Sequence, residues 1–289
     1  MDKILDFNCT YNSVSGIDGQ MAERLGLTFP DAYMHEESLV KIALAVKEQG
    51  QAPFCILPLC HTVEGAALGA DINYGNGEIG PRAGKQICSS AEDFLALPDI
   101  DFTKGRIAEV LKACSSLRAQ GEHVVLELSG PFTILDTLMD ARIVFRTMRK
   151  QPELMEKVLE KLRRNILAYF REAANAGVDL ISYADSSGGL NILGPKLAEQ
   201  MAVQFTYPLL KEVTEVLDEK TLVLLCPKTS FALLGTGKGQ WQELDLDGPM
   251  TYGQACIQSI GKLKFGGQMC IKNTGYILEK AKIKGIELL

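Results

Sequence analysis

Short apolar runs alternate with longer segments of helical periodicity along most of the chain. The segments 123–131 (HVVLELSGP), 178–185 (VDLISYAD) and 221–226 (TLVLLC) are apolar almost throughout, which is typical of strands buried on both faces of a parallel sheet. The segments 105–121 and 152–177 carry apolar residues at three- and four-residue spacing and end at a glycine, which predicts amphipathic helices. This alternation predicts an α/β fold.

The same patterns assign most of the remaining chain. Residues 52–60 (APFCILPLC) predict a short buried strand, and Asn76-Gly77 favours a tight hairpin turn. Thr133, followed three residues later by Asp136, resembles a capping box at the start of a helix. Further elements are predicted at 89–100 (helix), 132–150 (helix), 196–219 (helix), 239–247 (strand), 251–261 (helix) and 262–270 (strand).

The size and order of these elements favour a (β/α)8 TIM-type barrel over an open doubly wound sheet, because such barrels take about 250 residues. We expect a single domain over residues 1–289, in which residues 1–50 form an N-terminal helical extension. In this fold, binding residues lie at the carboxyl ends of the strands. These ends are polar, glycine-rich or cysteine-rich here: Cys60/His61, Ser129/Gly130, Asp185, Cys226 and Gly267–Cys270.

The net charge and the cysteine pattern of the chain indicate its cellular compartment and its class of partner. The chain has a net charge of −6 and no block of five or six like charges, so we expect no nucleic-acid partner, which would need a basic patch. No apolar run approaches the ~20 residues of a membrane span, and the first ten residues do not resemble a signal peptide. We therefore expect a cytoplasmic protein. None of its eight cysteines forms C-x-x-C, and in a reducing cytosol each is by default a small buried hydrophobe.

Two groups of residues before the last third of the chain could carry chemistry. Asp185 follows a predicted strand directly, so it is a candidate acid, base or ligand anchor, or else a helix cap. His61 follows Cys60 and precedes Glu64 by three residues. This cluster could bind zinc or place a base beside a nucleophile, and a structural role is the alternative.

Cys226 and Cys270 form a third candidate, 44 residues apart at two predicted strand ends. In a barrel two such ends can converge, and two thiolates there would suit zinc. The alternative is two unrelated buried cysteines.

Four segments of the chain resemble the uroporphyrinogen decarboxylase superfamily, and together they span roughly residues 50–270. They read LPLCHTVEGAALGADINYGNGEIGP, LELSGPFTIL, AGVDLISYADSSGG and LVLLC. The resemblance implies a (β/α)8 barrel and one of two functions. One is cofactor-free decarboxylation of a tetrapyrrole. The other is zinc-dependent transfer of a methyl group from a methylated corrinoid protein to a thiol such as coenzyme M.

The decarboxylase pattern is poorly matched. Those enzymes carry an arginine-rich N-terminal segment for the substrate's carboxylates, whereas Arg24 is the only arginine before residue 80. They also carry an aspartate seven residues before the alanine that corresponds to Ala67, and this chain has Cys60 there. The resemblance therefore favours the methyltransferase branch.

The methyltransferase pattern is matched in part. That branch binds zinc through His-x-Cys at the end of a late strand and through a second, later cysteine. Cys226 matches the first cysteine and Cys270 is the candidate for the second, at a shorter spacing, but Leu224 occupies the histidine position. The resemblance leaves the third ligand open among His61, Cys60, Glu64 and, more weakly, Gln268.

The resemblance thus implies a methyltransferase that takes its methyl group from methylcobamide on a corrinoid partner protein and transfers it to a small-molecule thiol. The residues it assigns are Cys226, Cys270 and His61 for zinc, Asp185, Glu64 and Tyr183 for catalysis, and His61, Phe132 and Ser129 for cofactor contact. Tetrapyrrole decarboxylation and a non-catalytic barrel that binds a corrinoid or tetrapyrrole remain as alternatives.

Overall fold

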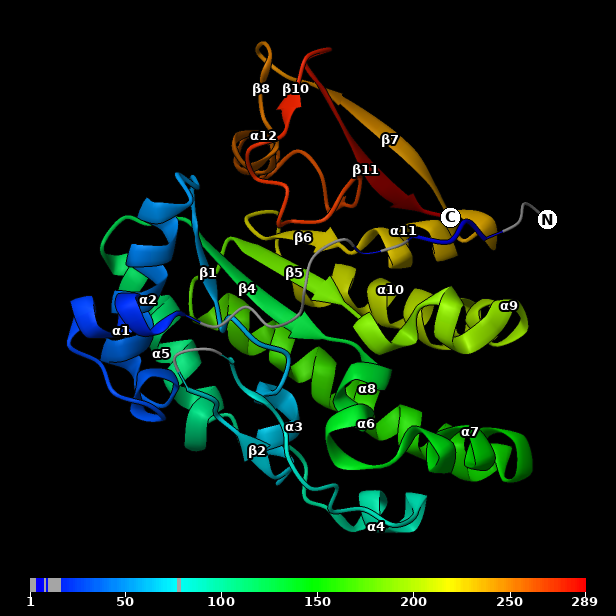
Figure 1. Cartoon of the computed structure of the whole chain (residues 1–289). Helices are drawn as coiled ribbons and strands as arrows, with labels where there is room; N and C mark the ends of the chain where they lie inside the picture. Colours follow the sequence, from blue (N-terminus) through cyan, green and yellow to red (C-terminus); the bar gives the residue numbers. More distant parts are fainter. Residues whose placement is uncertain (1–3, 8, 10–16, 77–78) are drawn as a thin grey trace.

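A mainly parallel sheet forms the centre of the molecule in the computed structural model, which describes residues 4–7, 9, 17–76 and 79–289 (Figure 1). Its strand order is β1-β4-β5-β6-β9-β11-β7. The four pairings from β1 to β9 are parallel, and β11 pairs antiparallel with both β9 and β7. The strands are β1 (Cys55–Leu57), β4 (Val124–Ser129), β5 (Leu180–Ala184), β6 (Leu222–Leu225), β9 (Phe265–Gly266), β11 (Lys282–Leu288) and β7 (Gly239–Asp245).

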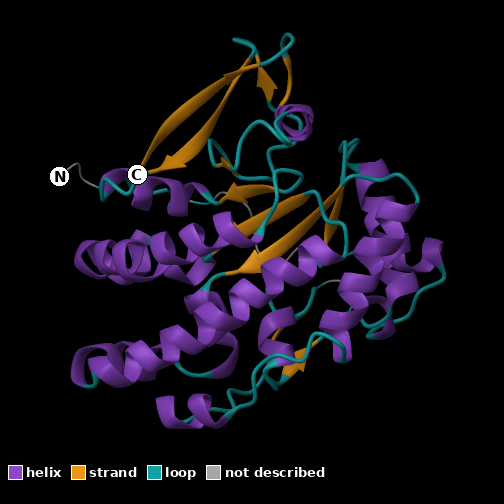
Figure 2. Cartoon of the chain, turned by 180° about the vertical axis from the view of Figure 1, so that it is seen from behind, coloured by secondary structure: helices purple, strands orange, loops and turns teal. Residues whose placement is uncertain are grey.

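The two faces of this sheet pack against different parts of the chain. Leu126, Leu128 and Tyr183 lie on one face, which we call the outer face, in the same core cluster as residues of the long helices. Val125 and Leu224 lie on the other, inner face and pack against α12 and the C-terminal strands. In Figure 2 most helices lie below the sheet or to either side of it, and the C-terminal strands project above it. The long helices are α2 (Glu36–Gln49), α5 (Gly105–Ala119), α8 (Pro152–Asn175) and α10 (Tyr207–Val216).

Shorter elements complete the connections between the strands. On the N-terminal side they are α1 (Gly19–Leu25), η1 (Asp31–Tyr33), α3 (Val63–Ala67), β2 (Ile72–Asn73), β3 (Arg82–Ala83), α4 (Ala91–Ala96), α6 (Pro131–Leu138) and α7 (Ala141–Lys150). On the C-terminal side they are η2 (Ser186–Gly188), α9 (Leu190–Met201), η3 (Ala202–Thr206), α11 (Pro227–Gly235), β8 (Met250–Thr251), α12 (Tyr252–Gln258) and β10 (Ile277–Leu278).

The predicted class, with strands alternating with helices around a parallel sheet, is confirmed. Among the strands that the structure describes, β1 and β7 stand at the two ends of the order. The last strands depart from a simple repeat, because β7 and β11 pair antiparallel over seven residues. β2 pairs antiparallel with β3, and the tight turn expected at Asn76-Gly77 stays a prediction because Gly77 lies outside the described residues. The assignment of one domain over 1–289 stays a prediction.

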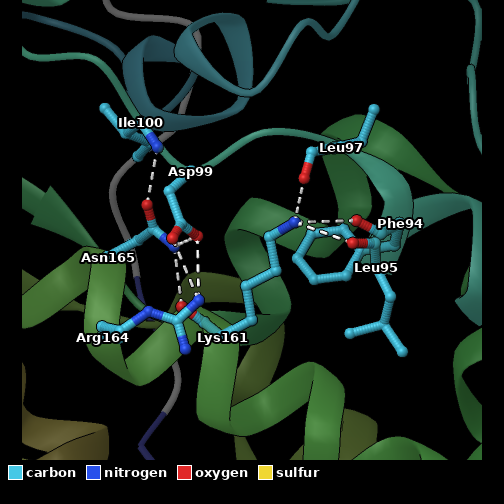
Figure 3. Close-up of polar contacts among 8 residues, drawn as sticks. All are labelled: Phe94, Leu95, Leu97, Asp99, Ile100, Lys161, Arg164 and Asn165. Atoms are coloured by element: carbon cyan, nitrogen blue, oxygen red, sulfur yellow. Dashed lines mark hydrogen bonds and ion pairs between the residues drawn. The ribbon is translucent and has the colours of Figure 1, made fainter.

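Lys161 ties the short helix α4 to the long helix α8 (Figure 3). Its ammonium group donates to the carbonyls of Phe94, Leu95 and Leu97, which satisfies carbonyls at the C-terminal end of α4. Burial lowers the pKa of Lys161. Four residues on, Asn165 accepts from the backbone of Ile100 at 2.7 Å. These contacts are structural, and they fix the loop that follows α4.

No helix in the described part of the chain is long and apolar enough to cross a membrane.

Candidate functional site

Asp185 lies at the end of β5 with its carboxylate against the N-terminus of α6. Oδ1 accepts from the backbone and the hydroxyl of Thr133, both at 2.8 Å, and Oδ2 accepts from the backbone of Phe132 at 3.2 Å. Burial raises the pKa of Asp185, and these hydrogen bonds oppose the rise. Three donors at a helix N-terminus make Asp185 the cap of α6.

The capping box predicted from Thr133 and Asp136 is therefore wrong. The N-cap of α6 is Gly130, which has no side chain to accept a bond. A residue from the neighbouring strand supplies the acceptor instead, 52 residues further along the chain. Space is tight there, because a Cβ added to Gly130 would lie 2.4 Å from the Cβ of Asp185.

Glu64 is a second carboxylate engaged by the backbone. It lies on α3, is buried, and its Oε1 accepts from the backbone of Ser129 at 2.6 Å. Burial raises the pKa of Glu64, and the bond to Ser129 partly offsets the rise. Because β1 ends at Leu57, the backbone N–H of Ser129 finds its partner on α3 rather than on β1. Glu64 and Ser129 thus form one structural contact.

Tyr183 and Phe132 line a small cavity at the end of β5. The cavity has a volume of about 40 Å³, and Asp6, Phe7, Asp185 and Lys228 also line it. The ring of Tyr183 packs against Phe170 at 5.9 Å. Burial raises the pKa of the Tyr183 hydroxyl well above its usual value. Tyr183 therefore shapes this cavity as a neutral side chain.

The N-terminal segment closes one side of this cavity. Phe7 packs against Phe231 of α11, with ring centroids 6.3 Å apart. The backbone of Ile4 lies directly on Gly235, where an added Cβ would approach the Cα of Ile4 to 2.6 Å. We call this cavity, at the C-terminal ends of β5 and β6, the mouth.

Cys226 follows β6 and continues its inner face, two residues beyond Leu224. Cys226 and Cys270 are both half-buried. Burial raises the pKa of Cys226 to about 11 and also raises the pKa of Cys270, and a charge on Cys270 would raise the pKa of Cys226 further. The two thiols are near one another and neutral at pH 7, and a charge on the exposed Cys9 would raise the pKa of both.

The other candidate zinc ligands are engaged elsewhere. Cys60 is buried and accepts from the guanidinium of Arg106 at 3.1 Å. Gln268 accepts from the backbone of Lys284 at 2.8 Å. Leu224 packs over Gly266 on the inner face, where an added Cβ would meet a Leu224 methyl at 2.7 Å. His61 lies half-buried beside Glu64.

The residues present do not fit a resident zinc. Within residues 4–7, 9, 17–76 and 79–289, no group of three His, Cys, Asp or Glu side chains is placed to hold a metal ion. A catalytic zinc site uses three protein ligands; Cys226 and Cys270 provide two, and Cys9, whose charge would act on both, is not placed with them as a metal-binding group. We therefore derive no step through zinc.

Glu127 is the residue that sequence reasoning missed. It is 8% exposed, and its side chain makes no hydrogen bond or ion pair with another described residue. Strand register places it in one row with Ser182, Leu224 and Gly266 on the inner face. Its charge contributes to raising the pKa of Cys270. The sequence does mark Glu127, because it is the one charged residue in the apolar strand VVLELS.

A buried hydroxyl without a hydrogen-bond partner in the described part of the chain lies near the thiols. The hydroxyl of Ser230 is buried without a hydrogen-bond partner among the described residues. Ser230 lies one helical turn after Cys226 and faces Gly267, where an added Cβ would approach its Oγ to 2.3 Å. The C-terminal end of the inner face thus holds one buried hydroxyl without a partner among the described residues, in addition to the Glu127 carboxylate.

The family model of uroporphyrinogen decarboxylase (URO-D) matches residues 15–242 of the chain. The methylcobamide:CoM methyltransferase MtaA of Methanosarcina barkeri is 25% identical over 217 residues, which are 74% of this chain and 63% of that protein. A uroporphyrinogen decarboxylase of Tolumonas auensis is 23% identical over 184 residues, 61% of this chain and 49% of that enzyme. The chain thus spans less than two thirds of the length of either relative.

A solved methyltransferase from Methanosarcina mazei shares the fold. It superposes with a TM-score of 0.65 at 23% identity, covering 81% of this chain and 68% of that one. The family model covers most of the sheet described above, from the N-terminal helices to β7. The chain belongs to the uroporphyrinogen decarboxylase (URO-D) family.

Proposed function

We propose that this protein is a methyltransferase that moves a methyl group from methylcobamide, carried by a corrinoid protein, to a small thiol. The likeness to the methylcobamide:CoM methyltransferase supports this class. We place the protein in the cytoplasm, where thiol acceptors stay reduced.

The observation that carries the proposal is the charge of the mouth. The described residues that line it include one cation, Lys228, and no arginine. Uroporphyrinogen has eight carboxylates, and their recognition requires several cationic donors. One lysine suits an acceptor with a single negative charge. Decarboxylation of uroporphyrinogen is therefore the weaker alternative.

Lys228 is positioned to stabilise an anionic acceptor. Its ammonium group donates to the carbonyl of Ser186 at 3.1 Å, at the loop that follows Asp185. Its remaining two donors are available to a thiolate bound at the C-terminal ends of β5 and β6. A cation beside a thiol favours the thiolate, which is the reactive form.

In this proposal the sulfur of the acceptor lies at the C-terminal end of the inner face, beside Cys226 and Cys270, and Glu127, which is not among the residues that line the mouth, supplies the base. A thiol acceptor must lose its proton before it attacks, and Glu127 is the buried inner-face carboxylate that no described partner neutralises. The proton moves from the acceptor sulfur to the Glu127 carboxylate. The thiolate then forms a bond to the methyl carbon, and the cobalt–carbon bond breaks with its electron pair left on cobalt, which is reduced from Co(III) to Co(I).

The experiment is a two-substrate comparison on the purified chain. Methylcobalamin is incubated with a series of thiols, and loss of the methyl–cobalt absorbance is followed with thioether formation by mass spectrometry. Uroporphyrinogen is offered in parallel, with decarboxylated porphyrins as the readout. We expect thioether and no decarboxylation. Decarboxylation, or binding of methylcobalamin without transfer to any thiol, would refute the proposal.

Measuring the zinc content of the purified protein tests separately whether the chain supplies enough ligands to hold zinc. Two thiols hold zinc weakly, so we expect less than about 0.2 zinc per chain after dialysis against a mild chelator. One zinc per chain that survives the chelator and is lost in Cys226→Ser would contradict this expectation and reveal a third ligand.

A further inference from the structure

Helix α7 presents a strongly basic face on an acidic protein. Within its ten residues, Arg142, Arg146, Arg149 and Lys150 are exposed, while Val144 and Thr147 are buried. Arg142 is engaged by Asp140, at 2.6 Å. The side chains of the other three cations make no hydrogen bond or ion pair with described residues. The chain as a whole carries a net charge of −6, so this cluster stands out against its surroundings.

A large groove adjoins this basic face. It has a volume of about 1240 Å³ and lies between α8 on one side and α9 with η3 on the other, where α7 forms one end. Its floor is apolar and includes Phe145, Met148, Met155, Leu197 and Phe205. In Figure 1, α9 lies above α7 on the same side of the molecule.

The rim of the groove is charged, and the charges differ between its walls. Arg149 and Lys196 lie at the α7 and α9 edges, and both are exposed. Glu153, Glu156 and Glu160 line the α8 wall and are exposed as well. An apolar floor inside a charged rim is the anatomy of a protein–protein interface. Because one edge of the groove carries positive charges and the α8 wall carries negative ones, a partner protein with complementary charges binds in one orientation.

The groove adjoins the mouth. Leu193 lines both the groove and the mouth. Phe132 of the mouth stacks on Phe145 of the groove, with ring centroids 6.4 Å apart. A protein seated in the groove would therefore lie next to the proposed site of methyl transfer.

We propose that the groove and the basic face of α7 dock the corrinoid-carrying partner protein through an acidic surface, an inference that rests on the proposed function. The volume exceeds the range of about 300–1,000 Å³ typical of small-molecule pockets. Apolar side chains of the partner enter the groove, its acidic edge meets Arg146, Arg149 and Lys150, and a basic edge meets the α8 wall. This arrangement brings the partner's corrinoid to the mouth.

The double variant Arg146→Glu/Arg149→Glu tests this interface. Two methyl donors are compared: free methylcobalamin, and an acidic corrinoid protein reconstituted with methylcobalamin. We expect kcat/KM for the protein-bound donor to fall 10- to 100-fold and to lose its dependence on salt, because steering between opposite charges is screened by ions. Activity with free methylcobalamin stays at the wild-type level, which also shows that the variant is folded.

The matched control is Lys220→Glu/Lys262→Glu, with the same charge change at two exposed positions just before β6 and β9. We expect it to keep full activity with both donors. An equal loss in the control would show a non-specific charge effect and overturn the inference. So would wild-type activity of Arg146→Glu/Arg149→Glu on the protein-bound donor, or a loss with free methylcobalamin, which would place these arginines on the corrinoid itself. Failure of the wild-type chain to use free methylcobalamin would count against the proposed function instead.

Discussion

The carboxylates of Asp185 and Glu64 accept hydrogen bonds from neighbouring residues, whereas that of Glu127 has no hydrogen-bond partner among the described residues. Asp185 caps α6 through three hydrogen bonds, and Glu64 holds the backbone of Ser129. Glu127 is as deeply buried as a core residue, yet no described residue pairs with it. A buried polar group that the fold leaves unpaired is costly, so it calls for a functional explanation.

This comparison changes where the chemistry is expected. Sequence position alone favours Asp185, because it follows a strand directly. The hydrogen bonds give Asp185 and Glu64 structural roles, and the proposed chemistry is therefore placed on the inner face, with Glu127, Cys226 and Cys270. Asp185 is a positioning residue in this account, since it holds α6 and Phe132 at the edge of the mouth.

The largest expected effect is that of Glu127→Gln on methyl transfer. We expect kcat with an ordinary alkyl thiol to fall about 10²- to 10³-fold, the usual contribution of a general base. An acceptor that is already ionised at neutral pH, such as a nitrothiophenol, should restore most of the rate. Steady-state kinetics with both thiols checks this, and an equal loss with both acceptors would assign Glu127 a structural role.

Asp185→Ala should reduce stability. Removing the cap leaves two backbone N–H groups and the Thr133 hydroxyl without their acceptor, so we expect the free energy of unfolding to fall by about 3 kcal/mol. Asp185→Asn keeps an acceptor oxygen and should lose about 1 kcal/mol. Urea unfolding followed by circular dichroism measures both. A fully stable Asp185→Ala would show that the cap is dispensable.

Gly130→Ala should be the next most harmful change. Its added methyl would overlap the Cβ of Asp185, and relief of that overlap costs about 2 kcal/mol. The control is Gly248→Ala, because an added Cβ at Gly248 meets nothing within 4 Å. In thermal unfolding, the melting temperature of Gly130→Ala should lie several degrees below that of Gly248→Ala. Identical melting temperatures would disprove the close packing at Gly130.

The smallest effect concerns the reactivity of Cys226. Its pKa of about 11 leaves a very small thiolate fraction at pH 7.5. Because raising the pH deprotonates the thiol, the rate of alkylation by iodoacetamide should rise about tenfold per pH unit and level off near pH 11. Peptide mass spectrometry after chelator treatment follows the rate. A plateau already at neutral pH would indicate a bound metal or cation beside the sulfur.

Much of the fold was predictable because its elements have local signals. The strands at 124–129, 180–184 and 222–225 are continuous apolar runs, and α5 and α8 follow clear helical periodicity. The antiparallel strand β11 was not predicted, since alternation in KIKGIEL is weak.

The site was harder to predict than the fold, because its geometry comes from long-range contacts. Asp185 and Thr133 are 52 residues apart in sequence, and nothing local shows that one caps the other's helix. The pairing of Cys60 with Arg106 likewise spans 46 residues. Glu127 did leave a local signal, a single charge within an apolar strand, but its lack of a partner appears only when the neighbouring strands are in place.

The most direct test of the account compares Glu127→Gln with Asp185→Asn in one assay. Both variants receive ¹³C-methyl-labelled methylcobalamin and an alkyl thiol, and labelled thioether is counted per folded molecule, with unfolding measured on the same samples. The account predicts that Glu127→Gln keeps its stability and loses transfer, while Asp185→Asn loses stability and keeps transfer. The reverse pattern, with transfer lost in a stable Asp185→Asn and retained in Glu127→Gln, would contradict it.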